Sequence, residues 1–410
     1  MIPSRTRCCG ATLPSYLGFA ILGLVNTIIP FIIFSANYLI IPYPRWVVIL
    51  IETLPALATK LLLPHVLHRV PYWMRPLTAG ACWILTAVVA GVTPPNVAPP
   101  LRIFTSVLAS SASAAMEVSF LGMTRYYGRP GLAGWGAGVG AGAVVCAVLP
   151  YLLTVWMDAF LRSFIDFVYV LTGAMLMGFF VVLPGAPVNY PHGQQRRAKD
   201  DIEDGPEGAS LLLLHPLEEL TRLLSTKNRT DLFKGAVRPF MVPLFVAFAT
   251  QAVVFPGVSR ALPVSSAFDT FFAYFTTYGF AFQLGSFISR TLTPLLRTRS
   301  TRVPFTILWF AAAAVLLNAV FSLFSSTVLV GLLAFCAGMM GGTIYMMVMD
   351  KVLEEKALEP GINQEFCLQV VGAGETAGLV VGGLFGAILE ASLCQWDIAA
   401  GNAHRWCTLR

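Results

Sequence analysis

The chain has 410 residues, of which 56% are hydrophobic and only 12% charged, and its formal net charge is +6 at neutral pH. About a quarter of the residues in soluble domains are charged, so this composition excludes an ordinary soluble protein. The basic residues lie in short segments between apolar blocks rather than in one cluster, which argues against a nucleic-acid-binding surface.

Apolar blocks of about 20 residues are typical of transmembrane helices, and about eleven such blocks follow one another along this chain. The sequence therefore predicts an all-α polytopic membrane protein with about eleven transmembrane helices. The blocks lie near residues 14–41, 46–67, 76–94, 103–124, 132–156, 164–184, 236–256, 268–291, 304–323, 326–349 and 366–390.

A polar stretch separates the sixth block from the seventh and reads as a disordered linker, because acidic and basic residues replace the apolar ones. Four regions are therefore predicted. They are an N-terminal six-helix bundle (1–186), the linker (187–234), a C-terminal five-helix bundle (235–391) and a tail (392–410).

The Lys and Arg residues predict the orientation, because loops on the cytosolic side are enriched in them. If the N-terminus is cytosolic, most of the 27 Lys and Arg residues lie in cytosolic segments. The linker is then cytosolic and the C-terminal tail lumenal. The glycosylation sequon at Asn228 would not be used, and Cys394 and Cys407 would lie on the lumenal side, where a disulfide can form.

The two bundles resemble each other at corresponding positions. The second block ends in Lys60-Leu-Leu-Leu-Pro64 and the eighth in Arg290-Thr-Leu-Thr-Pro294, while the fifth and eleventh blocks are both rich in glycine. This spacing predicts a parallel repeat of the major-facilitator type that lacks its last helix.

The fifth block contains the glycine run 134–142, which includes a string similar to a dinucleotide-binding fingerprint. That fingerprint requires a preceding strand and a soluble βαβ unit, and the surrounding sequence predicts neither. Small residues at this spacing in a membrane helix instead allow close helix packing, which is the interpretation we favour.

Ionisable residues interrupt the apolar blocks. Burial of such a group in a bilayer costs several kcal/mol unless it faces a partner or a wet cavity, so these residues are candidates for a solute or proton path. For the two basic residues, the alternative is that they reach the cytosolic interface along their side chains. The candidates are Glu52, Lys60, Glu117, Arg290 and Glu375.

No catalytic or metal-binding constellation is visible in the sequence. The five histidines have no ligand partners at a useful spacing, and the cysteines form no CxxC pair. We therefore expect neither an enzyme nor a bound cofactor or metal.

Several motifs together resemble the battenin family, which comprises the lysosomal membrane protein of Batten disease and its fungal vacuolar counterparts. The most specific match is Glu117-Val-Ser-Phe-Leu121. The others are Gly23-Leu-Val-Asn26, Phe34-Ser-Ala36, Glu52-Thr-Leu-Pro55, Lys60-Leu-Leu-Leu-Pro64, Pro71-Tyr72, Trp135 with Gly138 and Gly140, Phe233-Lys-Gly235, Gly285-Ser-Phe-Ile-Ser-Arg290, Gly341-Gly342 with Tyr345, and Glu365-Phe366.

The chain also departs from the family pattern. Gln251 stands where the family usually has a glutamate, and it is a further candidate for the solute or proton path. The end Cys407-Thr-Leu-Arg410 does not match the family's prenylation box. The family's acidic dileucine sorting signal does have a counterpart in Glu207, Leu211 and Leu212. The alternative for these leucines is the start of an amphipathic helix that lies on the membrane surface.

The resemblance implies a multi-pass vacuolar or lysosomal membrane protein involved in pH homeostasis and in the transport of a basic amino acid or a glycerophosphodiester. We expect a secondary transporter whose solute, together with protons, crosses a cavity between the bundles by alternating access. The expected partners are that solute, the lipid bilayer and sorting adaptors bound through the linker, with no nucleic acid. The rival hypothesis is a non-transporting regulator of vacuolar pH and trafficking that acts through the linker.

Overall fold

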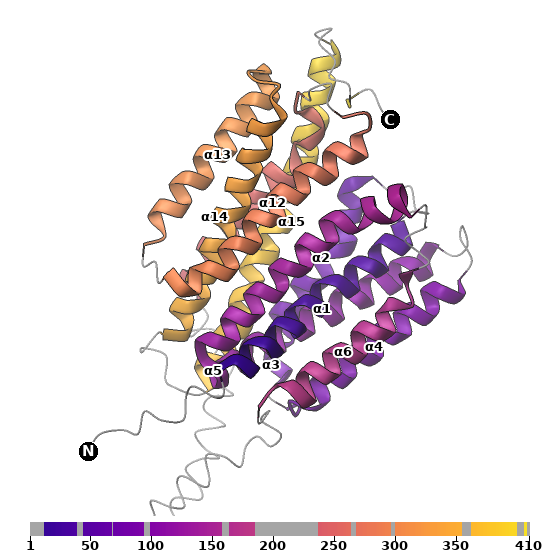
Figure 1. Ribbon diagram of the computed structural model, residues 1–410, viewed down its shortest axis with the longest axis vertical. Coiled ribbons are helices and arrows are strands. Elements are labelled where there is room, and N and C mark those ends of the chain that lie inside the picture. The colour runs from indigo at the N-terminus through magenta and orange to yellow at the C-terminus, as the bar shows by residue number, and fades with distance from the viewer. Residues whose placement is uncertain are drawn as a thin grey trace, which may run out of the picture.

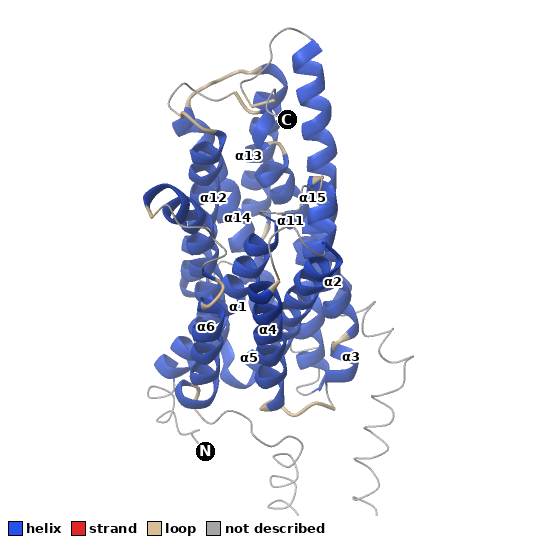
Figure 2. Cartoon of the chain, turned by 90° about the vertical axis from the view of Figure 1, so that its right-hand side faces the viewer, coloured by secondary structure: helices blue, strands red, loops and turns tan. Residues whose placement is uncertain are grey.

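The structure is a computed structural model that describes residues 12–38, 44–67, 69–93, 99–157, 164–184, 237–263, 268–296, 300–354, 362–399 and 406–407. Within these ranges the chain forms helices and turns, without a strand (Figure 2). The predicted linker 187–234, with Glu207, Leu211, Leu212 and Asn228, lies outside the described residues.

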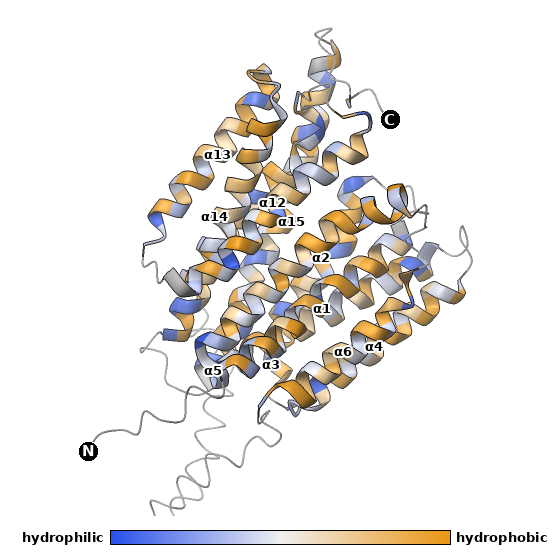
Figure 3. Cartoon of the chain, in the orientation of Figure 1, coloured by the Kyte–Doolittle hydropathy of each residue, from blue (hydrophilic) through white to orange (hydrophobic). Residues whose placement is uncertain are grey.

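The helices follow the apolar blocks of the sequence, and apolar residues cover most of their length (Figure 3). Each predicted block overlaps a helical segment. The N-terminal half, coloured indigo to magenta in Figure 1, contains α1 (Thr12–Tyr38), α2 (Arg45–Leu62), α3 (Pro64–Leu67), α4 (Met74–Val92), α5 (Pro99–Tyr151) and α6 (Phe167–Met177). The C-terminal half, orange to yellow, contains α11 (Arg238–Ala252), α12 (Phe271–Leu296), α13 (Arg302–Phe321), α14 (Thr327–Glu354) and α15 (Ile362–Ala399).

Seven described helical segments are long and apolar enough to cross a membrane. They are 12–37, 74–92, 99–156, 238–257, 302–321, 327–354 and 364–396, and a shorter apolar helix covers 167–182. The chain is therefore an all-α polytopic membrane protein, as the sequence predicts. The count of about eleven crossings stays a prediction.

Helix α5 contains two predicted blocks and the turn between them. Gly128 has φ 65° and ψ −152°, a conformation that residues with a side chain rarely adopt. The rings of Phe120 and Trp135, one from each limb, lie 5.9 Å apart, so the chain reverses direction at Gly128. A tight turn at one glycine thus replaces the longer loop expected between residues 124 and 132.

Glycines allow equivalent helices to touch in both halves. A Cβ atom on Gly138 would lie 2.1 Å from the carbonyl oxygen of Ala20 in α1, and one on Gly382 would lie 2.2 Å from that of Ala249 in α11. The glycine runs therefore serve close helix packing, as expected. The first and fifth predicted helices of each half make the same kind of contact, which agrees with the predicted repeat.

The two halves lie side by side and meet along α2 and α5 on one side and α12, α14 and α15 on the other (Figure 1). Gly140 of α5 brings that helix close to α12, because a Cβ atom there would lie 2.8 Å from the Cα atom of Phe287. Gly383 of α15 faces the side chain of Ile49 of α2, which would lie 3.4 Å from a Cβ atom placed there. This interface positions the charged residues described next.

Candidate functional site

Four of the predicted charged residues meet where the two halves touch. Lys60 Nζ, near the end of α2, donates a 2.7 Å hydrogen bond to Glu117 Oε1 of α5. Arg290 of α12 donates a 3.2 Å bond to Glu375 Oε1 of α15. The side chains of the two basic residues are 5% and 8% exposed, so both ion pairs are buried.

The two ion pairs form one group, here named the central cluster: Lys60, Glu117, Arg290 and Glu375. Glu375 interacts electrostatically with the other three members. Gly372, one turn before Glu375 on α15, leaves room for the other pair, since a Cβ atom there would lie 3.3 Å from Glu117 Oε1 and 4.0 Å from Lys60 Nζ. The cluster thus combines two positive and two negative groups from both halves of the protein.

Pairing explains how these charges are accommodated in an apolar interior. An isolated charge at this depth would cost several kcal/mol, whereas opposite charges at hydrogen-bonding distance offset most of that cost. The side chains of Lys60 and Arg290 are buried in ion pairs inside the bundle. An aromatic ring adds to the site, because the guanidinium group of Arg290 lies 4.5 Å from the ring centre of Tyr345.

Glu52 lies on the same helix as Lys60 but outside the central cluster. Lys60 pairs with Glu117, and in the described part of the chain the Glu52 carboxyl group has no hydrogen bond or ion pair. Ser110 donates only to the backbone oxygen of Glu52. Glu52 therefore does not join the central cluster.

Gln251 also lies outside the cluster and joins two helices. Its Nε2 atom donates a 2.7 Å hydrogen bond to the carbonyl oxygen of Ala337, which attaches α11 to α14. A Cβ atom on Gly341 would overlap the Gln251 amide, so this glycine makes the space for it. The contact lies about two turns before Tyr345 on α14.

Two groups of charges that the sequence does not reveal form ion pairs between the halves, and each lies at one end of the bundle. At the first end, here named the Arg129 face, Arg129 Nε donates a 2.9 Å hydrogen bond to Asp350 and its Nη2 contacts Glu354. The Tyr72 hydroxyl donates to Glu365 of α15 at the same end. Burial raises the pKa of the Tyr72 hydroxyl, and the Glu365 carboxylate raises it further, so this hydroxyl remains a donor.

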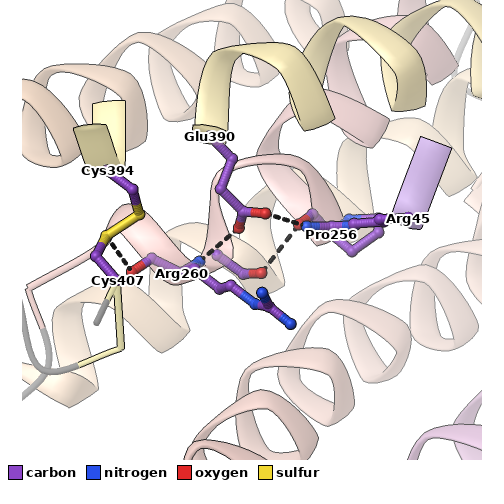
Figure 4. Close-up of polar contacts among 7 residues, drawn as sticks. Arg45, Pro256, Arg260, Glu390, Cys394 and Cys407 are labelled. Carbon is purple, nitrogen blue, oxygen red and sulfur yellow. Dashed lines mark hydrogen bonds and ion pairs between the residues drawn. A yellow bond between two sulfur atoms is a disulfide. The ribbon is translucent and has the colours of Figure 1, made fainter. Parts of the chain in front are cut away.

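The opposite end, here named the Arg45 face, is shown in Figure 4. Arg45 at the start of α2 donates to the Glu390 carboxylate of α15 and to the carbonyl oxygen of Pro256. A disulfide joins Cys394 to Cys407 at this face, the two cysteines that the sequence places together on the lumenal side. The sequence marks these charges only as residues that orient the helices, because no local pattern reveals a partner so far along the chain.

Comparison with known proteins gives one consistent result. The family model described as CLN3 protein matches residues 17–396. Protein BTN1 of Chaetomium globosum is 31% identical over 95% of this chain and 90% of its own length. Protein BTN1 of Yarrowia lipolytica is 29% identical over 96% and 98%, and Protein btn-1 of Neurospora crassa is 27% identical over 96% and 90%.

Proposed function

This chain belongs to the CLN3 family of membrane proteins, and from that premise we propose that it is a vacuolar or lysosomal transporter. It would move a small polar solute by alternating access and thereby contribute to organelle pH homeostasis. The solute would be of the basic amino acid or glycerophosphodiester type.

The central cluster is the observation that carries this proposal. Its two ion pairs are buried among apolar helices, and its members come from both halves of the protein. A stabilising core would achieve as much with apolar side chains, because buried ion pairs contribute little net stability. Buried charges in a membrane interior are typical of paths for solutes and protons.

The pairs also suggest how a solute would bind. A solute that carries a positive group, a negative group or both can replace one member of an ion pair, so each charge keeps a partner while the solute is bound. Protons can take the same place by neutralising Glu117 or Glu375. The Tyr345 ring beside Arg290 would offer a flat apolar surface to the rest of the solute.

Alternating access requires that the halves separate at one end while they remain joined at the other. Charged contacts join the halves at both ends, through Arg129 and Asp350 on one face and through Arg45 and Glu390 on the other. Each of these contacts would open in only one of the two transport states.

The direct test is uptake into proteoliposomes with an imposed pH gradient and a panel of amino acids and glycerophosphodiesters. We expect flux of at least one solute, and a loss of at least about tenfold in Glu117→Gln, which leaves the buried Lys60 without a charged partner. Lys351→Gln is the matched control, because it removes an exposed charge from the end of α14 and should keep the flux. Absence of flux of any solute, in wild type and both variants alike, would contradict transport.

The second candidate is a regulator of vacuolar pH and trafficking without transport activity. It is favoured by the acidic dileucine pattern in the predicted linker, at Glu207, Leu211 and Leu212. Deletion of residues 187–210 separates the two hypotheses. A deletion that abolishes cellular function, combined with harmless neutralisation of Glu117 and Glu375, would favour the regulator.

The proposed location is the vacuolar membrane, with the N-terminus and the linker in the cytosol. Sorting adaptors would bind Leu211 and Leu212, so a tagged double alanine variant should appear at the plasma membrane. Unchanged vacuolar location would favour the amphipathic surface helix instead. A glycan mapped to Asn228 would show that the orientation is inverted.

A further inference from the structure

At the Arg45 face, one carboxylate connects the two halves of the protein. One oxygen of Glu390 accepts a hydrogen bond from Arg45 of α2, and the other accepts a 2.7 Å bond from the backbone nitrogen of Arg260 (Figure 4). Arg45 donates a second bond to the carbonyl oxygen of Pro256. We call these contacts of Arg45, Glu390, Pro256 and Arg260 the clamp.

The clamp depends on how the segment between α11 and α12 is placed. Pro256 and Arg260 belong to the turns that follow α11, and both contribute to the clamp through backbone atoms. The Pro256 oxygen accepts from Arg45, and the Arg260 nitrogen donates to Glu390. Glu390 is buried, with 8% of its side chain exposed, whereas 29% of Arg45 is exposed. A partly exposed arginine binds weakly unless its acceptors are fixed in advance, so the position of the 256–260 segment decides the strength of the clamp.

The disulfide brings the C-terminal tail onto this same segment. Cys394 lies one turn after Glu390 on α15, and its bond to Cys407 places the Cys407 sulfur 3.7 Å from the Arg260 carbonyl oxygen. Trp406 is buried, and its ring centre lies 5.6 Å from that of Phe271. The guanidinium group of Arg260 lies 5.3 Å from the centre of the same Phe271 ring. Trp406 and Cys407 therefore lie against the segment that supplies the acceptor and the donor of the clamp.

We propose that the disulfide-bonded tail is a positioning element for a gate at the Arg45 face. Cys394–Cys407 holds residues 406–407 against Arg260, the Arg260 backbone orients the Glu390 carboxylate, and Glu390 with Pro256 retains Arg45. Without the disulfide, the clamp opens more readily and this end of the interface becomes accessible from the aqueous side. The inference rests on the alternating access of the proposed function, in which this end must open.

The contacts of the clamp are coupled to one another. Hydrogen bonds that share one carboxylate support one another, because each bond restricts the orientation that the next requires. A change at residues 406–407 reaches Arg45 through two steps, Arg260 and Glu390. Couplings between neighbouring sites of this kind typically change an equilibrium by about tenfold.

The test measures accessibility rather than transport. Ile49→Cys places a thiol on α2 one turn after Arg45, where Ile49 packs against Gly383 of α15 in the closed interface. In full-length protein whose six other cysteines outside the Cys394–Cys407 pair are replaced by alanine, its reaction rate with a bulky, membrane-impermeant maleimide reports opening of the Arg45 face. Thermal unfolding of each variant in detergent shows that it is folded.

Three variants are compared in that background. Cys394→Ser with Cys407→Ser should raise the labelling rate about tenfold, and Arg45→Gln should raise it by a similar factor. The combination should add little to either, because both changes act on one clamp. Arg129→Gln, which removes an ion pair at the opposite end, is the matched control and should not raise the rate.

Each other outcome overturns the proposal. An unchanged rate in the double serine variant, with a raised rate in Arg45→Gln, would show that the tail does not position the clamp. Unchanged rates in both would show that the clamp does not close this end. Full additivity of the two changes would show that they act independently. Labelling does not require transport of a solute. A negative transport assay would therefore contradict the proposed function without changing the outcome of the labelling experiment.

Discussion

The central cluster and the Arg129 face both place acid–base pairs where the two halves meet, but they differ in their access to water. Each ion pair of the cluster lies within one half, whereas Arg129 pairs with Asp350 across the contact. The side chains of Lys60 and Glu117 are 5% and 18% exposed, whereas those of Arg129 and Asp350 are 33% and 28% exposed. A charge that loses its partner in the interior stays desolvated, whereas one at the face is solvated by water. Similar distances therefore correspond to very different energies, and burial decides which pair the fold depends on.

The largest expected effect comes from Lys60→Met, which leaves the Glu117 carboxylate buried without its partner. We expect the free energy of unfolding in detergent to fall by about 3–5 kcal/mol, as for other buried pairs that lose one member. Chemical denaturation of the purified protein measures it. The double variant Lys60→Met with Glu117→Met should regain most of this loss, since no charge is left unpaired. A double variant as unstable as the single one would show that packing, not charge, is responsible.

Glu365→Gln tests whether the loss of stability follows the burial of a charged side chain or its position along the bundle. Glu365 lies at the same end as Arg129, yet its side chain is only 13% exposed and accepts a hydrogen bond from Tyr72, with Arg75 3.9 Å away. We expect a loss of about 1.5–3 kcal/mol, because hydrogen bonds to charged groups contribute about that much. The same denaturation experiment checks it. A loss as small as that of an exposed pair would contradict the importance of burial.

Gly372→Val disturbs the central cluster without removing a charge. The new side chain would press on Glu117, and overpacking of this kind costs about 1–3 kcal/mol. Gly331→Val is the matched control, because no atom lies within 4 Å of a Cβ atom placed on Gly331 of α14. Equal changes in the unfolding temperature of the two variants would show that the cluster can accommodate the larger side chain without strain.

Arg129→Gln should have the smallest effect. Exposed ion pairs contribute about 0.2–1 kcal/mol, so the change in stability should stay within that range. Salt screens such pairs, and the difference from wild type should shrink further in about 1 M salt. A loss that equals that of Lys60→Met would remove the distinction between the two regions.

Much of this architecture follows from the sequence. Each predicted apolar block overlaps a helix, because a segment that crosses a bilayer must satisfy its own backbone hydrogen bonds, and a helix does so locally. The family was also recognisable from short motifs such as Glu117-Val-Ser-Phe-Leu121, and the family model confirms it. The turn at Gly128 was not foreseen, since one positive φ angle replaces a whole loop.

The charged residues show which features could not be predicted from the sequence. It identified Lys60, Glu117, Arg290 and Glu375 as costly in an apolar setting, because that cost depends only on their neighbours along the chain.

The packing of the helices determines that these four meet and that Glu52 does not join them. Partners such as Arg45 and Glu390 belong to helices far apart in sequence, and helix packing alone brings them within hydrogen-bonding distance. The energy of a charge depends on the atoms within a few ångströms of it, which no local pattern specifies.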